Sequence, residues 1–112
     1  MKIFVFEHVV VTRVIDGDTY AVEIDLGLGM HRIDQRVRLF GLDCPERKTP
    51  EGKAALAFAQ TLLPVGTPVI LTSHEWDKYG RLLAEVRLNF DLDTRDVATE
   101  LRAAGFVKVA PV

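Results

Sequence analysis

The chain has 112 residues, of which 48% are hydrophobic and 27% are charged, and its formal net charge is −2 at pH 7. This length suits one domain with a single core and is too short for two ordinary domains. The negative net charge argues against a protein that holds long nucleic acid through a basic overall field. For any nucleic-acid partner we therefore expect modest affinity and a shallow salt dependence.

Cysteine usage and hydropathy narrow the protein class further. Cys44 is the only cysteine, so an internal disulfide and a multi-cysteine zinc site are both excluded. No stretch approaches the roughly 18 apolar residues of a membrane span, and the apolar run within Met1–Glu7 is brief. These features favour a cytoplasmic protein without a membrane partner.

The first half of the chain predicts three strands. Residues 9–15 are β-branched and apolar and end in an Asp-Gly turn, while 20–26 and 36–40 alternate between apolar and charged residues. Gly27 and Gly29 indicate a hairpin loop between the second and third strands, which we expect to extend to Asp34.

A hairpin centred near Met30 and His31 sets the register of these two strands. It predicts the pairs Val22 with Leu39, Ile24 with Val37, Glu23 with Arg38 and Asp25 with Arg36. The same register places Asp18 opposite Asp43 at the open end of the hairpin. Two facing carboxylates repel each other, so we expect a positive charge between them.

The second half of the chain predicts helix, two strands and helix. Thr49 can cap a helix that begins at Pro50 and covers residues 51–63, with Leu56, Ala59 and Leu63 on one stripe. Residues 67–72 and 81–88 follow as strands, and a short helix spans about 94–104 with Gly105 as its stop. This order predicts an α+β, mainly β fold: one domain, residues 1–112, built as a five-stranded OB-fold Greek-key barrel.

Four motifs in this order and spacing carry a family resemblance. They are "VIDGDT" (14–19), "RLFGLDCPE" (38–46), "DKYGR" (77–81) and "ELRAAGFVKVA" (100–110). Together they resemble the staphylococcal (micrococcal) nuclease family over almost the whole chain. The resemblance implies a Ca²⁺-dependent enzyme that hydrolyses phosphodiesters of DNA and RNA and leaves 3′-phosphates.

The resemblance also implies a role for each matching residue. By this resemblance, Asp18, Asp43 and the backbone carbonyl of Cys44 bind the metal, and Glu46 orients the attacking water. Arg38 and Arg81 bind the scissile phosphate, and Lys78 and Tyr79 contact the nucleotide. Independent chemistry supports this set, because calcium prefers hard oxygen ligands. Planar guanidinium groups also bind phosphate oxygens through paired hydrogen bonds.

Taken singly, several of these residues have ordinary structural explanations. Arg38 could be only the cross-strand partner of Glu23, and Arg81 a solvated strand start. Trp76 could either fold onto the barrel or stack on a base. The spacing of Arg38 and Asp43 is odd, so the catalytic interpretation requires the strand to break between them, and Gly41 is the expected place.

The sequence departs from the family pattern in three places. Residues 47–55 lack a lysine-rich insertion, Pro111 stands where a nucleotide-binding tyrosine is expected, and no third C-terminal helix follows. We therefore expect weaker substrate binding, or self-association or a partner over the exposed flank. Two rival functions stay open: a nucleic-acid-binding module without catalysis, and a protein-binding barrel whose acidic mouth holds a structural cation.

Overall fold

The computed structural model describes residues 2–89 and 95–107. Its elements are β1 (Val5–Asp16), β2 (Thr19–Gly27), β3 (Met30–Leu39), α1 (Pro50–Leu62), β4 (Pro68–Trp76), β5 (Leu82–Leu88) and α2 (Val97–Ala103). The mainly β class with two short helices is therefore confirmed. Within the described part of the chain, neither helix has the length and apolar character to cross a membrane.

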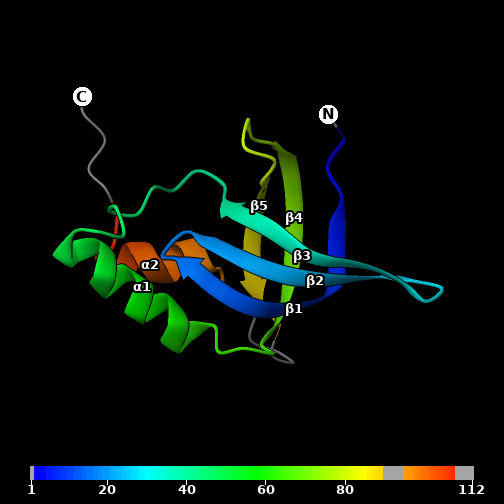
Figure 1. Cartoon of the computed structure of the whole chain (residues 1–112), viewed down its shortest axis with the longest axis horizontal. Coiled ribbons are helices and arrows are strands. Elements are labelled where there is room, and N and C mark those ends of the chain that lie inside the picture. Colours follow the sequence, from blue (N-terminus) through cyan, green and yellow to red (C-terminus); the bar gives the residue numbers. More distant parts are fainter. Residues whose placement is uncertain (1, 90–94, 108–112) are drawn as a thin grey trace.

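The five strands close into a barrel in the order β1-β2-β3-β5-β4. Only the β3–β5 pair is parallel; the other neighbours run antiparallel. Figure 1 shows α1 and α2 together at one end of the barrel, while the β2–β3 hairpin projects from the other end. This is the predicted OB-fold plan, with a helix between the third and fourth strands.

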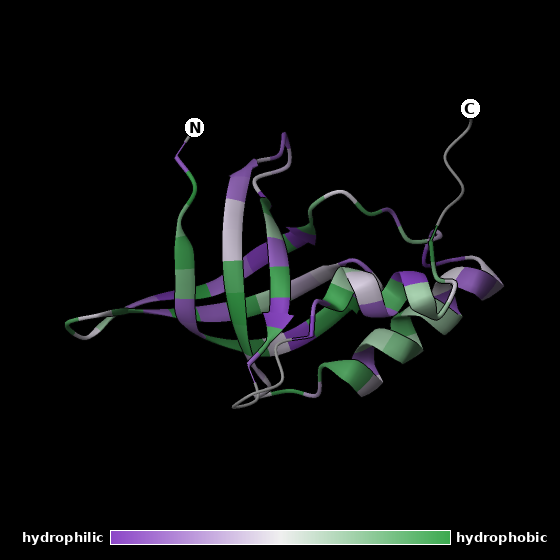
Figure 2. Cartoon of the chain, turned by 180° about the vertical axis from the view of Figure 1, so that it is seen from behind, coloured by the Kyte–Doolittle hydropathy of each residue, from purple (hydrophilic) through white to green (hydrophobic). Residues whose placement is uncertain are grey.

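The core lies inside the barrel and beneath the two helices. Hydrophobic and hydrophilic segments alternate along the strands in Figure 2, as expected when one strand face is buried and the other meets solvent. The largest fully buried side chains include Tyr20, Leu39, Leu71, Leu88 and Leu101. Complete burial of each such aliphatic side chain contributes about 1.5 to 3 kcal/mol of stability.

Helix α1 follows the local signals that predicted it. The side chain of Thr49 accepts a hydrogen bond from the backbone N of Gly52 at 3.0 Å, and Pro50 occupies the first turn. The buried side of α1 carries Gly52, Ala55 and Ala59, small residues that let the helix lie close to the barrel. Leu56, predicted on this stripe, is only half-buried.

The C-terminal helix is shorter than predicted in the described residues. Helix α2 begins at Val97, and the predicted start near Thr94 falls in 90–94, outside the described residues. Gly105 ends it with φ = +84°, a conformation that favours glycine after a helix. Pro111 and the end of the fourth motif also lie outside the described residues.

The predicted register of the β2–β3 hairpin is wrong. The observed pairs are Thr19–Arg38, Tyr20–Val37, Ala21–Arg36 and Val22–Gln35, so the predicted pairs Val22–Leu39, Ile24–Val37, Glu23–Arg38, Asp25–Arg36 and Asp18–Asp43 do not form. The turn is the two residues Leu28 and Gly29, both at positive φ, and 30–34 belong to β3 rather than to a loop. The observed register differs from the predicted one by about four positions. An even shift keeps each side chain on its face, so alternation alone could not detect it.

Candidate active site

The turn between β1 and β2 is packed tightly against two other segments. A Cβ at Gly17 would lie 3.0 Å from the Cβ of Ala55 in α1 and 3.1 Å from the Sγ of Cys44, which follows β3. The buried hydroxyl of Tyr20 donates a hydrogen bond to the carbonyl of Gly17 at 2.6 Å. A side chain at position 17 would therefore be tight against Ala55 and Cys44, and the turn that carries Asp18 is held in one place.

Asp18 joins the β1–β2 turn to the segment after β3. It is only 7% exposed, and its Oδ2 accepts a hydrogen bond from the backbone N of Cys44 at 2.9 Å. The hydroxyl of Thr19 donates to its other carboxylate oxygen at 3.2 Å. A buried carboxylate needs such partners, and these bonds fix its position beside Cys44.

Arg38 lies between the two carboxylates that were predicted to bind metal. Its Nη1 is 3.3 Å from Asp18 Oδ2, and its Nη2 forms an ion pair with Asp43 Oδ1. Nη1 also donates to the carbonyl of Leu42 at 2.6 Å. The expected positive charge between the carboxylates is therefore supplied, in this structure, by a guanidinium.

The chain reverses direction between Arg38 and Asp43. An unbroken strand would place these two residues on opposite faces, because they are an odd number of positions apart. Strand β3 ends at Leu39, and Gly41 has φ = +74°, a conformation that side chains with a Cβ rarely adopt. The break returns Asp43 to the guanidinium of Arg38. The predicted break at Gly41 is confirmed, whereas the alternative pairing of Arg38 with Glu23 is wrong, because Glu23 faces His31 at 3.5 Å.

The donor set fits a hard cation by its chemistry. The carboxylates of Asp18 and Asp43 and the carbonyl of Cys44 are oxygen donors of the kind that calcium prefers. Burial, followed by the charge of Asp18, raises the pKa of the Cys44 thiol to about 12. Calcium prefers hard oxygen ligands to sulfur, so the carbonyl of Cys44 is the donor that suits it. No group of three or more His, Cys, Asp or Glu side chains that could hold a metal forms within the described residues. A cation would compete with Arg38 for the same carboxylate oxygens.

Asp16, the last residue of β1, is a third carboxylate near Asp18 and Arg38, and the family resemblance implies no role for it. Burial raises the pKa of Asp16; a hydrogen bond from the backbone N of Gly17 opposes this, and the nearby charge of Asp18 raises it further. The signal was present in the sequence as two aspartates around one glycine in "VIDGDT". Asp16 adds negative charge beside the proposed metal ligands.

Glu46 is anchored by its backbone rather than by its side chain. Its carbonyl accepts hydrogen bonds from the backbone N of Thr49 at 2.9 Å and from the Thr49 hydroxyl at 2.7 Å. A Cβ at Gly52 would lie 1.7 Å from this carbonyl oxygen, so only glycine permits the close approach of α1. The carboxylate of Glu46 is exposed and makes no hydrogen bond or ion pair within the described chain.

Arg81 is oriented by Asp77 across the β4–β5 turn. Arg81 Nε donates to Asp77 Oδ2 at 2.6 Å, and Asp77 Oδ1 accepts from the backbone N of both Tyr79 and Arg81 at 2.9 Å. Burial raises the pKa of Asp77, but these hydrogen bonds and the charge of Arg81 outweigh that effect and lower it. The turn is therefore built around an ionised Asp77.

A single groove of about 510 Å³ brings five of the predicted residues together. They are Arg38, Asp43, Lys78, Tyr79 and Arg81. The Tyr79 ring is 70% exposed, with Lys78 Nζ and the Arg81 guanidinium carbon 5.2 and 5.3 Å from its centroid. Asp18 and Cys44 adjoin the groove through Arg38 and their mutual hydrogen bond, whereas Glu46 does not line it.

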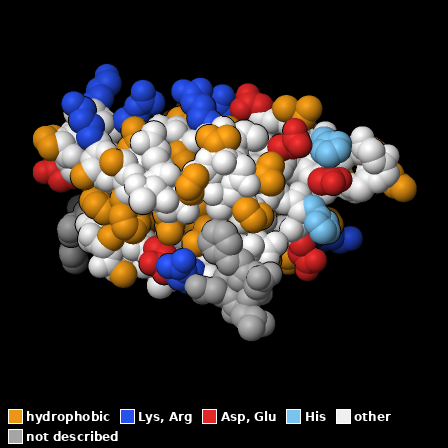
Figure 3. Space-filling view, turned by 90° about the horizontal axis from the view of Figure 1, so that it is seen from below, with side chains coloured by type: hydrophobic (Ala, Val, Ile, Leu, Met, Phe, Trp, Pro, Cys, Tyr) orange, Lys and Arg blue, Asp and Glu red, His pale blue; other side chains and the backbone are white. Residues whose placement is uncertain are grey.

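Charged side chains are unevenly distributed on the face seen in Figure 3. Figure 3 shows Lys and Arg side chains gathered mainly toward the helical end of the lower face, and the His and several Asp and Glu side chains toward the hairpin end. The net charge of the whole chain is nevertheless −2. Binding of an anionic polymer would therefore depend on local cationic groups.

Comparison with known proteins gives consistent similarities. A thermonuclease of Staphylococcus intermedius is 39% identical over 101 residues, which cover 84% of this chain and 56% of that protein. An uncharacterized endonuclease of Escherichia coli O157:H7 is 35% identical over 79 residues, 70% of this chain and 47% of that protein. Protein ParB of Escherichia coli is 34% identical over 85 residues, 76% of this chain and 44% of that protein.

The chain spans about half the length of these curated relatives. The family model described as "Staphylococcal nuclease homologue" matches residues 36–112, more than half of the chain. The matched range includes the end of β3, both arginines of the groove and the segment from Asp43 to Glu46. The chain therefore belongs to the staphylococcal nuclease homologue family.

Proposed function

We propose that this protein is a calcium-dependent nuclease that hydrolyses phosphodiesters of DNA, RNA or both and leaves 3′-phosphate products. The observation that carries the proposal is the groove in which the guanidinium groups of Arg38 and Arg81 lie with the carboxylate of Asp43. Similarity to a thermonuclease and to an endonuclease supports the same activity.

Asp18, Asp43 and the carbonyl of Cys44 would hold the calcium ion. The bound ion would supply Lewis-acid polarisation of a phosphate oxygen and orientation of the attacking water. Asp18 is already fixed by its hydrogen bond from Cys44 N, whereas the side chain of Asp43 is 69% exposed and, among the described residues, is held through Arg38. Asp43 is therefore the ligand with freedom to exchange a guanidinium for a cation.

Arg38 and Arg81 would bind the scissile phosphate. Each guanidinium is now paired with carboxylates of this chain, Arg38 with Asp18 and Asp43, and Arg81 with Asp77. Negative charge grows on the phosphate oxygens as water attacks, and guanidinium groups stabilise it through paired hydrogen bonds. Asp77, which accepts a hydrogen bond from Arg81 Nε, would hold the guanidinium in position while its other nitrogens contact the phosphate.

Glu46 would orient and deprotonate the attacking water. An ordinary glutamate has a pKa of about 4.3 and is a weak base, so its contribution would be the 10² to 10⁴-fold typical of a positioned acid–base group. Its carboxylate has no partner within the described chain to compete for that water. Lys78 and Tyr79 would contact the nucleotide beside the scissile bond, because both line the groove.

The proposal is tested by cleavage of end-labelled single-stranded DNA and RNA with calcium and with a chelator. We expect calcium-dependent products whose gel mobility changes after phosphatase treatment, as 3′-phosphates require. Asp43→Asn should lose most of the activity at limiting calcium. Asp34→Asn is the matched control, because Asp34 is an exposed hairpin residue at φ = +53°, which asparagine tolerates.

A non-catalytic binding module is the alternative that one observation favours, because Arg38 already forms ion pairs with both carboxylates. Nucleic-acid binding without cleavage at saturating calcium would favour that module. Calcium binding that a nucleoside bisphosphate cannot influence would favour a protein-binding barrel with a structural cation.

A further inference from the structure

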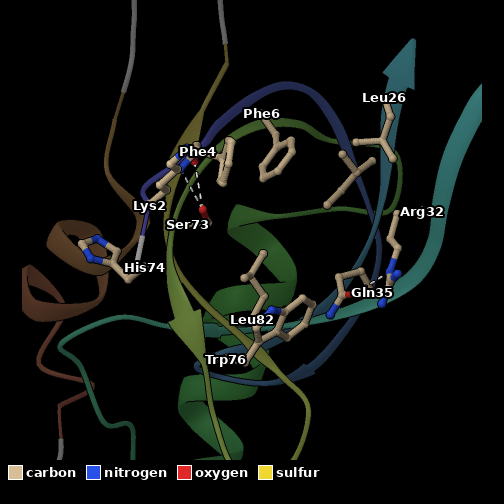
Figure 4. A pocket seen from close by; sticks show the side chains of 11 residues that line it. Lys2, Phe4, Phe6, Leu26, Arg32, Gln35, Ser73, His74, Trp76 and Leu82 are labelled. Carbon is tan, nitrogen blue, oxygen red and sulfur yellow. Dashed lines mark hydrogen bonds between the residues drawn. The ribbon is translucent and has the colours of Figure 1, made fainter. Parts of the chain in front are cut away.

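The barrel has a second cavity, separate from the groove, at its open mouth. Figure 4 looks into this cavity along the barrel, with α1 visible at the far end. It has a volume of about 420 Å³, and the aromatic side chains of Phe4, Phe6 and Trp76 line it. None of the residues proposed above for metal, water or phosphate lines it.

The lining of this cavity combines aromatic rings with cations. Lys2 and Arg32 line it, and no Asp or Glu does so within the described residues, although the chain has 16 acidic residues. The Arg32 guanidinium carbon lies 5.9 Å from the centroid of the Trp76 ring, and its Nε donates to Gln35 Oε1 at 3.0 Å. This chemistry suits a planar ring that carries a negatively charged backbone.

The walls of the cavity are held by hydrogen bonds. Ser73 Oγ accepts from the backbone N of Phe4 at 3.0 Å and donates to its carbonyl at 3.1 Å, and the backbone N of Ser73 donates to the same carbonyl at 2.8 Å. The rings of Phe4 and Phe6 lie with centroids 6.4 Å apart. Phe4 is nevertheless 55% and Trp76 49% exposed, so large aromatic faces are available without rearrangement.

The turn between β4 and β5 lies between the cavity and the groove and contributes residues to the groove, while the strand ends on either side of it line the cavity. Trp76 and Leu82 pair at the ends of these strands and line the cavity. The residues between them, Asp77 to Arg81, supply part of the groove wall. A single strand of nucleic acid that crosses this turn would therefore meet both sites.

We propose that the mouth cavity, defined by Phe4, Phe6, Arg32 and Trp76, binds a base of single-stranded nucleic acid beyond the scissile bond. The base stacks on the exposed rings, and Arg32 and Lys2 contact the adjoining phosphates. This inference rests on the proposed nuclease function and extends the contacts of the bound strand from the groove to the mouth cavity. A strand that is long enough to reach both the groove and the mouth cavity should therefore bind more tightly than a dinucleotide.

Trp76 gives a direct readout, because it is the only tryptophan. The protein is titrated with oligothymidylate of about 12 nucleotides and, separately, with the dinucleotide, while the fluorescence of Trp76 is recorded. A length of about 12 lies within the roughly 4 to 16 nucleotides that an OB fold covers. A chelator is present so that no cleavage occurs. We expect quenching by the longer strand and much less by the dinucleotide. Phe4→Ser and Arg32→Gln should each weaken binding of the longer strand by about tenfold. Val65→Ser, at an exposed apolar residue outside the cavity, should leave it unchanged.

The outcomes separate this inference from the proposed function. Calcium-dependent cleavage of the dinucleotide, with no effect of Phe4→Ser or Arg32→Gln on binding of the longer strand, overturns the inference and leaves the nuclease intact. Absent cleavage with tenfold weaker binding in both variants supports the cavity and contradicts the nuclease. A wild-type dimer in sedimentation that Phe4→Ser dissociates, with no quenching by the oligonucleotide, would assign the mouth to a second copy instead. Arg32 is exposed, so Arg32→Gln keeps the test valid if Phe4→Ser does not fold.

Discussion

The two ends of the barrel differ in how much side-chain surface they leave exposed. At the helical end the segments are fixed by hydrogen bonds and close contacts, as the bonds from Tyr20 to Gly17 and from Cys44 to Asp18 illustrate. At the open mouth, Phe4 and Trp76 leave about half of their surface to solvent. The first arrangement positions reactive groups, whereas the second offers area for binding. Under the two proposals above, chemistry and strand recognition would lie on opposite sides of the β4–β5 turn.

Replacing a groove arginine with lysine should have a large effect on the rate. Arg81→Lys should lower kcat on a dinucleotide by about 10² to 10³-fold, because an ammonium cannot form the paired hydrogen bonds of a guanidinium. Steady-state kinetics measure it. Arg32→Lys, at the open mouth, should change the same kcat less than about twofold; equal losses at the two arginines would remove the distinction between the ends.

A methyl group at Gly52 should disrupt the helical end. In Gly52→Ala the new Cβ would meet the carbonyl oxygen of Glu46 at 1.7 Å, so the Asp43–Glu46 segment must move. We expect the free energy of unfolding to fall by about 2 kcal/mol, because overpacking outweighs the better helix propensity of alanine. Urea unfolding measures this change. Lys53→Ala, at the next and exposed position, should stay within about 0.5 kcal/mol of the wild type, and an unchanged Gly52→Ala would contradict the contact.

Removal of one buried hydroxyl should have a smaller effect. Tyr20→Phe leaves the Gly17 carbonyl without its donor, and we expect a loss of about 1 to 2 kcal/mol in the free energy of unfolding. The matched control is Tyr79→Phe, whose ring is exposed in the groove. Thermal and urea unfolding of both variants compare the two sites. Equal stability of the two variants would show that the Tyr20 hydrogen bond does not hold the turn.

The smallest effect is a pH dependence at the β4–β5 turn. The pKa of Asp77 lies below its ordinary value of 3.8, so its ionised form stabilises the folded state above that value. This contribution should be lost as the pH falls from near 3.8 through the lower folded pKa. Subtraction of the unfolding free energy of Asp77→Asn from that of the wild type at each pH measures it. A difference that stays constant or grows on acidification would contradict the assignment.

Local signals predicted the parts of the fold that local chemistry determines. The cap at Thr49, the stop at Gly105 and the chain reversal at Gly41 each depend on one or two residues, and each was found. The register of β2 and β3 was missed because an even shift preserves the buried face. The turn also uses Leu28 at positive φ, a conformation that sequence rarely signals.

The candidate site was predicted less completely than the fold. The motifs identified residues of the groove, but they could not show that Arg38 pairs with both Asp18 and Asp43. That pairing depends on how the β1–β2 turn packs against the end of β3, and the close approach of Gly52 to Glu46 depends on the path of the chain into α1. Both are contacts between segments that a sequence pattern does not pair. The mouth cavity was missed for the same reason, since its aromatic residues come from β1, from the segment before it and from β4.

The most direct test of the account is single-turnover cleavage at saturating calcium by the wild type and by Glu46→Gln. We predict that Glu46→Gln is slower by about 10² to 10⁴-fold, with an unchanged urea midpoint because its carboxylate has no partner in the described chain. Glu51→Gln, at an exposed residue of α1, should cleave at the wild-type rate. Equal rates for Glu46→Gln and the wild type would contradict the claim that this end of the barrel hydrolyses phosphodiesters.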